Sequence, residues 1–166
     1  MEVLTIIITS GIVTALINIG WKYVENQTAF KNAKYMQISN YYRDKSGDDM
    51  HKILNDWTDM LMSPNDPAVA AKMSDSNHIN KLLKDTFLYS SPETCKRLVN
   101  YQTDNYQNTE GESFHKKIVL IAGIIVSLKH DFTGEWVSIE EVLRLKINDF
   151  EVNKIGFDNA ILSLNY

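Results

Sequence analysis

Residue types that carry acid–base and metal chemistry are spread thinly along this chain. Its four histidines are His51, His78, His115 and His130, and no two of them form an HExxH or HxxxH pair. Such a pair would place two ring nitrogens on one helix face, as a bound zinc ion requires. The spacing therefore predicts no metal site, and we expect no cofactor.

The best candidates for an acid–base set are His130 and Asp131, which are adjacent in the segment LKHDF, together with Asp149 in the later segment INDF. Such groups can serve as general base and general acid. Neighbouring residues i and i+1 do not face each other on a helix, however, and both aspartates suit helix ends or turns. We expect no catalytic residue and a non-enzymatic protein, with a membrane-held hydrolase or nuclease as the alternative.

The single cysteine, Cys95, is followed directly by Lys96 and Arg97. Neighbouring cations can activate a thiol as a nucleophile, but a lone cysteine is more often a small residue on a packed helix face. One cysteine excludes an intrachain disulfide, which fits a reducing compartment. The chain also has no GxGxxG, GxxxxGK[ST] or GxSxG motif.

An N-terminal segment of 18 residues, Val3 to Gly20, carries no charge. As a helix it rises about 27 Å, the short end of what a bilayer core of about 30 Å requires. Trp21, Lys22 and Tyr23 follow at once, where an aromatic belt and a snorkelling lysine lie at a membrane interface. We predict a transmembrane anchor over residues 1–21.

Three other interpretations of this segment compete with the anchor. A secretory signal would carry Lys or Arg before the apolar run and small residues after it, whereas Glu2 precedes this run and bulky residues follow. A buried helix of a soluble fold and a helix in the membrane interface stay open as alternatives. The run is interrupted by polar residues, namely Thr5, Thr9, Ser10, Thr14 and Asn18.

Small residues recur at helical spacing inside the predicted anchor. Ser10 and Thr14 are four residues apart, as are Gly11 and Ala15. Small side chains let two membrane helices approach closely. We therefore expect membrane lipid as one partner, and either another membrane protein or a second copy as the other, through these four residues.

Charge is divided unevenly between a basic neck, residues 22–46, and an acidic body, residues 47–166. Residues 21–45 carry a net charge of +3 and Glu2 carries −1, so the chain's net charge of −4 leaves −6 for residues 46–166. By the positive-inside rule, we expect a single-pass protein of the cell membrane with its N-terminus outside and most of the chain in the cytoplasm. An acidic body argues against nucleic acid as a partner. The aromatic and basic neck could stack single-stranded nucleic acid, but its position favours anionic lipid headgroups.

The predicted fold is all-α, with the N-terminal transmembrane helix continuing into a cytoplasmic helical bundle. Only 7 glycines and 3 prolines are present, which disfavours a turn-rich β fold. No Gly or Pro separates Gly20 from Gly47, so the anchor helix continues through the neck until SGDD, residues 46–49, ends it and caps the next helix.

Hydrophobic periodicity then predicts the helices of the body, residues 47–166. The first carries an apolar face at i, i+3, i+4 spacing, made of Met50, Ile53, Leu54, Trp57, Met60 and Leu61. Later helices begin at Pro67, after a serine cap before Pro92, and at the capping box Ser138–Glu141. The segment 112–131 is the central buried helix, and residues 151–166 form either a helix or a strand. Two further apolar faces are predicted, one of Ile79, Leu82, Leu83 and Phe87 and one of Leu98, Val99, Tyr101 and Tyr106.

Three segments resemble a loose set of small bacterial and phage-borne proteins of unassigned function. They are FLYSSPETCKRLVNY (87–101), IIVSLKHDFTG (124–134) and LRLKINDFE (143–151), with Tyr89-Ser90-Ser91 where that set often has Tyr-Gly-Ser. The run EVLTIIITSGIVTALI and the layout of the opening are similar to lactococcal-type superinfection-exclusion proteins. Those are short, phage-encoded and tethered by an N-terminal membrane helix. The resemblance implies phage exclusion or host defence and transfers no site residue. Apart from the resemblance, an accessory subunit of a membrane-protein complex is an alternative function.

Overall fold

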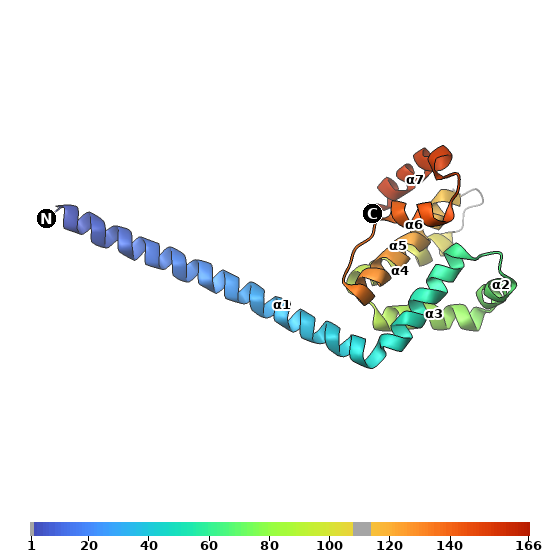
Figure 1. The fold of residues 1–166 in the computed structure, drawn as a ribbon, viewed down its shortest axis with the longest axis horizontal. Coiled ribbons are helices and arrows are strands. Elements are labelled where there is room, and N and C mark those ends of the chain that lie inside the picture. The colour runs from blue at the N-terminus through green and yellow to red at the C-terminus, as the bar shows by residue number, and fades with distance from the viewer. Residues whose placement is uncertain (1, 108–113) are drawn as a thin grey trace. The chain divides into compact units, whose positions relative to one another are not determined.

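The computed structural model describes the backbone of residues 2–107 and 114–166 and the side chains of residues 17–34, 37, 47–107 and 114–166. Within these ranges the chain is all-α, as predicted, and forms seven helices without a strand (Figure 1). They are α1 (Glu2–Met62), α2 (Pro67–Ser74), α3 (Ser76–Tyr89), α4 (Pro92–Gln107), α5 (Phe114–Thr133), α6 (Ile139–Lys146) and α7 (Phe150–Leu164).

The chain consists of two compact units, Met1–Asp44 and Lys45–Tyr166. The prediction that residues 46–49 end the first helix is wrong, because α1 is continuous to Met62. Glycine in a helix costs only about 1 kcal/mol relative to alanine, and no other part of the chain crowds Gly47. Lys52 lies 3.8 Å from the Asp49 carboxylate one turn earlier, which supports the helical conformation at this point.

Helix α5 is the centre of the unit Lys45–Tyr166 and packs against α4, α6 and α7. Its sequence is apolar nearly all round, and a helix of that kind is stable only when it is buried. Val119, Leu120, Ala122 and Ile124 have no exposed surface, and every residue from 122 to 128 is buried. The predicted central helix is therefore confirmed.

The last turns of α1 provide the second wall of this core. Met50, Ile53, Trp57 and Leu61 are buried, with Leu54 and Met60 partly buried against them, so the predicted apolar face is confirmed. The Trp57 indole Nε1 donates to Thr86 Oγ1 at 2.8 Å, and both side chains are almost completely buried. The Tyr101 ring packs edge-on against Trp57, 5.2 Å between centroids.

The faces predicted for α3 and α4 are partly wrong. Phe87, Val99 and Tyr106 are 64%, 62% and 82% exposed, whereas polar Thr86 and Thr94 are fully buried. The reason is that hydrogen bonds satisfy these hydroxyls. Thr86 donates to Leu82 O at 2.7 Å while accepting from Trp57, so a short polar side chain fills a core position at little cost.

Local sequence signals set most of the helix boundaries. Asp66 caps α2 by accepting from the Ala68 backbone N–H at 2.8 Å, with Pro67 in the first turn. The predicted capping box at α6 is present, since Ser138 and Glu141 exchange side-chain to backbone bonds of 2.6 and 3.1 Å. The C-terminal segment, for which the sequence allows helix or strand, is helix α7.

Candidate functional site

Large apolar groups are exposed on α1 over the described side chains of residues 17–34. We call this set the neck surface, although it includes the last residues of the predicted anchor as well as the start of the neck. Exposed fractions are 64% for Ile17, 73% for Trp21, 61% for Val24 and 69% for Phe30. Ile17, Trp21 and Val24 fall on one face of the helix, and an exposed apolar set of this kind marks a contact with lipid or protein. Two hydrogen bonds of these described side chains stay on α1, one of them from Thr28 Oγ1 to Val24 O at 3.0 Å.

The three residues predicted at the membrane interface all belong to the neck surface. Trp21 and Tyr23 are 73% and 66% exposed, and Lys22 is exposed as well. The Tyr23 hydroxyl accepts from the Gln27 side-chain amide at 3.3 Å. These three exposed side chains are thus available for contact with an external surface, each with an apolar ring or stem and a polar end.

The four residues predicted for helix–helix contact, Ser10, Gly11, Thr14 and Ala15, lie outside the described side chains. Among the residues that are described, the helices contain no stretch long and apolar enough to cross a membrane. Residues 1–16, which hold most of the predicted anchor, are not part of that described set.

Asp131 lies in the last turn of α5 and holds the start of α4. Its Oδ2 accepts from the Ser91 backbone N–H at 2.8 Å and from Thr94 Oγ1 at 2.7 Å. Both donors precede it by about forty residues in the chain, and the Asp131 side chain is only 6% exposed. The carboxylate therefore satisfies a helix N-terminus and complements the positive end of its dipole.

His130 and Asp149 are engaged elsewhere. The His130 ring stacks on Trp136 with 4.0 Å between centroids and 15° between planes, while its Nδ1 is 3.8 Å from Asp131. Asp149 is exposed at the start of α7, where its carboxylate accepts from Asn153 Nδ2 at 2.9 Å. Within the described part of the chain nothing joins Asp149 to the other two, so the candidate acid–base set is not assembled.

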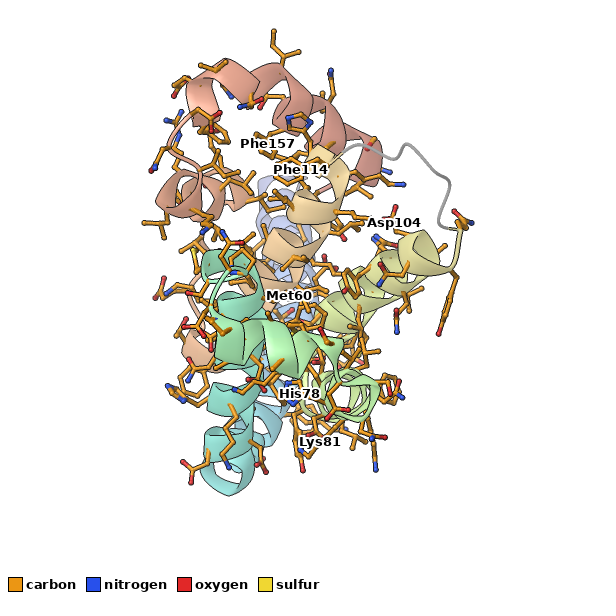
Figure 2. The ribbon with its side chains drawn as sticks, turned by 90° about the vertical axis from the view of Figure 1, so that its right-hand side faces the viewer. Met60, His78, Lys81, Asp104, Phe114 and Phe157 are labelled. Atoms are coloured by element: carbon orange, nitrogen blue, oxygen red, sulfur yellow. The ribbon has the colours of Figure 1, made fainter. Side chains whose placement is uncertain are left out.

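Cys95 is partly buried, with Sγ 3.6 Å from Ser90 Oγ and 3.8 Å from Phe87 O. These contacts place Cys95 at the corner where α3 ends and α4 begins. The histidines are separate, and the described residues contain no group of three His, Cys, Asp or Glu suited to a metal ion. Figure 2 places His78 on α3, at the end of the unit away from Phe157.

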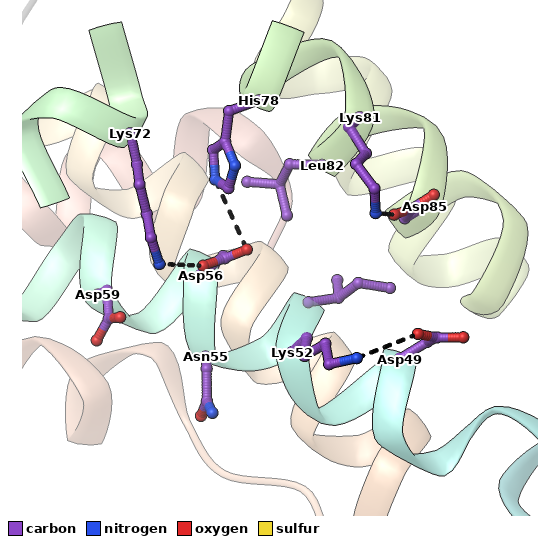
Figure 3. Close-up of a pocket in the computed structure, with 11 residues that line it drawn as sticks. Asp49, Lys52, Asn55, Asp56, Asp59, Lys72, His78, Lys81, Leu82 and Asp85 are labelled. Carbon is purple, nitrogen blue, oxygen red and sulfur yellow. Dashed lines mark hydrogen bonds and ion pairs between the residues drawn. The ribbon is translucent and has the colours of Figure 1, made fainter. Parts of the chain in front are cut away.

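A charged groove of about 450 Å³ lies between the end of α1, α2 and α3 (Figure 3). The Asp56 carboxylate is central, 3.3 Å from Lys72 Nζ and 3.6 Å from His78 Nε2. Lys81 and Asp85 pair on the α3 side at 2.5 Å. The lining residues include no serine, threonine or cysteine, so no hydroxyl or thiol lies beside the His–Asp pair. The Asp56 carboxylate thus links the end of α1 to α2 through Lys72 and to α3 through His78.

A second cavity, of about 540 Å³, is lined by residues of α4, α5 and α7, the segment before α6, the first turn of α6, and Tyr166. Arg97, which sequence reasoning treated only as a neighbour of Cys95, is buried here. Its Nη1 donates to Gly123 O at 3.0 Å and its Nε to Glu93 at 3.1 Å. The guanidinium lies over the Tyr166 ring, 4.6 Å from its centroid. No signal in the sequence pointed to a buried arginine at this position.

Tyr166 lines this cavity and packs against α5 at Gly123, which has no side chain. A Cβ built at Gly123 would lie 2.6 Å from Tyr166 Cε2, so only glycine accommodates the ring. The Tyr166 hydroxyl accepts from Asn100 at 3.4 Å. Burial raises the pKa of the Tyr166 phenol, and the Asn100 bond and the Arg97 charge partly oppose this shift.

Comparisons with known proteins give no match: no family model, no curated protein and no solved structure corresponds to this chain.

Proposed function

We propose that this protein is a non-enzymatic, membrane-tethered interaction protein, with phage superinfection exclusion or another host-defence role at the cytoplasmic membrane as its specific function. The observation that carries the proposal is the neck surface. Directly after a charge-free run, Trp21 and Tyr23 present their rings to the surroundings at exposures of 73% and 66%, and Phe30 follows further along the helix at 69%. In the proposed arrangement, the membrane interface covers the first two of these rings.

The distribution of charge supports the same arrangement. Lys22, Lys31 and Lys34 are exposed on the neck surface, whereas the body carries the negative charge. Each basic residue near an anionic leaflet is favourable by about 1 kcal/mol, so the neck would lie against the cytoplasmic face. The N-terminus is then outside, the anchor spans once, and the body projects into the cytoplasm.

The outer side of the body offers surface for protein contact. Val152, Ile155 and Leu162 of α7 are 85%, 78% and 74% exposed, at spacings that place them on one helical face. Asp131, the best candidate base, is used in holding α4. The exposed face of α7 supports an interaction role, and the structural use of the Asp131 carboxylate argues against the hydrolase or nuclease alternative.

A phage-challenge experiment tests the specific role. Cells expressing the full chain and cells carrying the empty vector are infected with a panel of phages, and adsorption, DNA admission and plaque formation are scored. Exclusion predicts normal adsorption with reduced DNA admission for at least one phage. Normal adsorption and normal admission across the panel would refute exclusion.

The broader role as an interaction protein is tested by purification in detergent. A stoichiometric membrane-protein companion would support an accessory subunit, and a variant with Val152, Ile155 and Leu162 changed to Ser should lose a companion bound through α7. These three side chains are exposed, so the substitutions should leave the fold intact.

A further inference from the structure

The cavity of about 540 Å³ beside α4, α5 and α7 has a single cation, Arg97, among the described residues that line it, and we call it the Arg97 cavity. Arg97 is only 9% exposed. Cavities of roughly 300–1,000 Å³ have the size that holds small organic ligands. This cavity lies wholly within the unit Lys45–Tyr166, so an inference about it does not depend on the proposed membrane anchor.

The guanidinium of Arg97 keeps hydrogen-bond donors that the protein does not use. Nε donates to Glu93 at 3.1 Å and Nη1 to Gly123 O at 3.0 Å, so two of the five N–H groups of an arginine are bonded. The other three have no hydrogen-bond partner among the described residues. Nη2 makes neither bond and is not sealed from solvent. Because buried polar groups are normally hydrogen-bonded, these donors at the cavity wall suit a ligand with acceptor oxygens.

The positive charge of Arg97 is only partly balanced by the protein. The side chain of its partner Glu93 is 46% exposed, so water screens this ion pair. The two carboxylates that line the cavity, Glu140 and Asp158, accept from basic side chains at 2.8 and 2.9 Å and do not contact Arg97. The site can therefore accept one further negative charge at Arg97, and a carboxylate matches the planar fork of a guanidinium.

Apolar and aromatic side chains form most of the remaining lining. The Arg97 Cζ lies 4.6 Å from the centroid of the Tyr166 ring and 5.9 Å from that of the Trp136 ring. Trp136 and Leu162 are 53% and 74% exposed, so the cavity is open to solvent beside them. The aliphatic members of the lining are Val126, Val137, Ile139, Ile161 and Leu162. A ligand that fits this lining has an apolar body as well as an acceptor group.

We propose that the Arg97 cavity binds a small organic carboxylate with an apolar body of about one or two rings. The carboxylate accepts from the unused N–H groups of Arg97, and the body packs against Trp136 and the aliphatic lining. Inorganic phosphate lacks the apolar body, and its second negative charge is disfavoured near Glu140 and Asp158. A cationic ligand of the same shape is repelled by Arg97.

Calorimetric titration of the full chain in a non-ionic detergent tests the class of ligand on the native protein. The carboxylate probes are benzoate, phenylbutyrate and naphthaleneacetate. The controls are the neutral naphthaleneacetamide, the cationic naphthylethylamine and inorganic phosphate, and each titration into protein-free detergent is subtracted. We expect saturable binding of at least one carboxylate at one site per chain, with naphthaleneacetate bound about ten-fold or more tightly than its amide. No saturable binding of any carboxylate, or equal affinity for the acid and the amide, would overturn the proposal.

Two exposed residues of α7 give a matched pair of variants that locates the binding. Leu162 is 74% exposed and lines the cavity, whereas Ile155 is 78% exposed and does not line it. Leu162→Trp should obstruct the opening and weaken naphthaleneacetate binding about ten-fold, and Ile155→Trp should leave the affinity unchanged. Both positions are exposed, so the fold is retained in each variant. Equal affinities of the two variants would contradict binding in this cavity.

Glu93→Gln tests the role of Arg97 while the arginine stays in place. The half-exposed Glu93 carboxylate is removed, so the Arg97 charge is less balanced and the affinity for naphthaleneacetate should rise about three-fold or more. An arginine that only supports the fold would give no such gain, and an unchanged or weaker affinity would count against the proposal. Arg97→Gln should remove the preference for the acid over the amide, with near-ultraviolet circular dichroism as the check on folding. If that variant does not fold, Glu93→Gln and the pair of α7 variants still decide the outcome.

Discussion

Replacing Asp131 tests whether this residue is a structural cap or a catalytic carboxylate. Its Oδ2 accepts two bonds, of 2.8 Å from the Ser91 N–H and 2.7 Å from the Thr94 hydroxyl, at a side chain only 6% exposed. A hydrogen bond to a charged group contributes about 1.5–3 kcal/mol, and a buried donor left without a partner costs about 1–3 kcal/mol. Water can reach the partly exposed Ser91 but not the fully buried Thr94. We expect Asp131→Ala to lower the free energy of unfolding by about 3–4 kcal/mol.

Asp131→Asn separates charge from hydrogen bonding. Both bonds end on one oxygen, so an asparagine that presents its amide oxygen there keeps both. What it loses is the carboxylate charge at the start of α4, a loss of about 1 kcal/mol. Asp149→Ala serves as the matched control. That side chain is exposed and bonds only within its own helix, so we expect a change of less than about 0.5 kcal/mol.

The assay is urea unfolding of the full chain in mild detergent, followed by near-ultraviolet circular dichroism. A loss of less than about 1 kcal/mol for Asp131→Ala, or equal losses for Asn and Ala, would refute the structural assignment. A catalytic carboxylate would give the opposite pattern, in which Asn abolishes function while stability hardly changes.

Three further predictions concern the core and the Arg97 cavity. Gly123→Ala should cost about 1–3 kcal/mol in thermal unfolding, because its Cβ would meet Tyr166, and Tyr166→Ala in the same chain should remove most of that clash; additive losses would contradict it. Thr86→Val should cost about 1–3 kcal/mol by leaving the buried Trp57 N–H without an acceptor, and an unchanged urea midpoint would be inconsistent with the bond. Because burial raises the pKa of Tyr166, its contribution to stability is complete below the unfolded value of 10.0 and falls as the pH rises toward the folded value. Unfolding between pH 8 and 11 should show this loss in the native chain and less of it in Tyr166→Phe.

The elements of the body that carry strong local signals could be predicted from the sequence. The continuous apolar run of α5, the capping box at Ser138 and Pro67 after Asp66 each act within one or two turns, and the structure agrees with them. The prediction of a helix end at residues 46–49 was wrong, because the glycine and polar residues there disfavour the helix only weakly. A cost of about 1 kcal/mol for Gly47 does not outweigh helical continuity into the packed turns that follow.

The interior polar contacts could not be predicted, because they join residues far apart in the chain. The partners of Asp131 lie about forty residues before it, and the Trp57–Thr86 bond spans twenty-nine residues. Burial of Arg97 depends on two distant partners, Gly123 O of α5 and the Tyr166 ring at the C-terminal end, in addition to Glu93 one turn earlier on α4. Hydrophobic periodicity contains no information of this kind, and it therefore assigned Phe87, Val99 and Tyr106 to the core in place of Thr86 and Thr94.

Fractionation of the full-length chain tests the central claim of membrane tethering most directly. Membranes are washed with alkaline carbonate and then dissolved in detergent, beside a variant with Ile12→Asp in the charge-free run, where a charge costs roughly 2.5–3.5 kcal/mol at the helix centre. Membrane tethering predicts that the native chain stays in the carbonate-washed pellet and is released only by detergent, and that the variant is recovered there in smaller amount. A native chain found in the supernatant without detergent would contradict the claim.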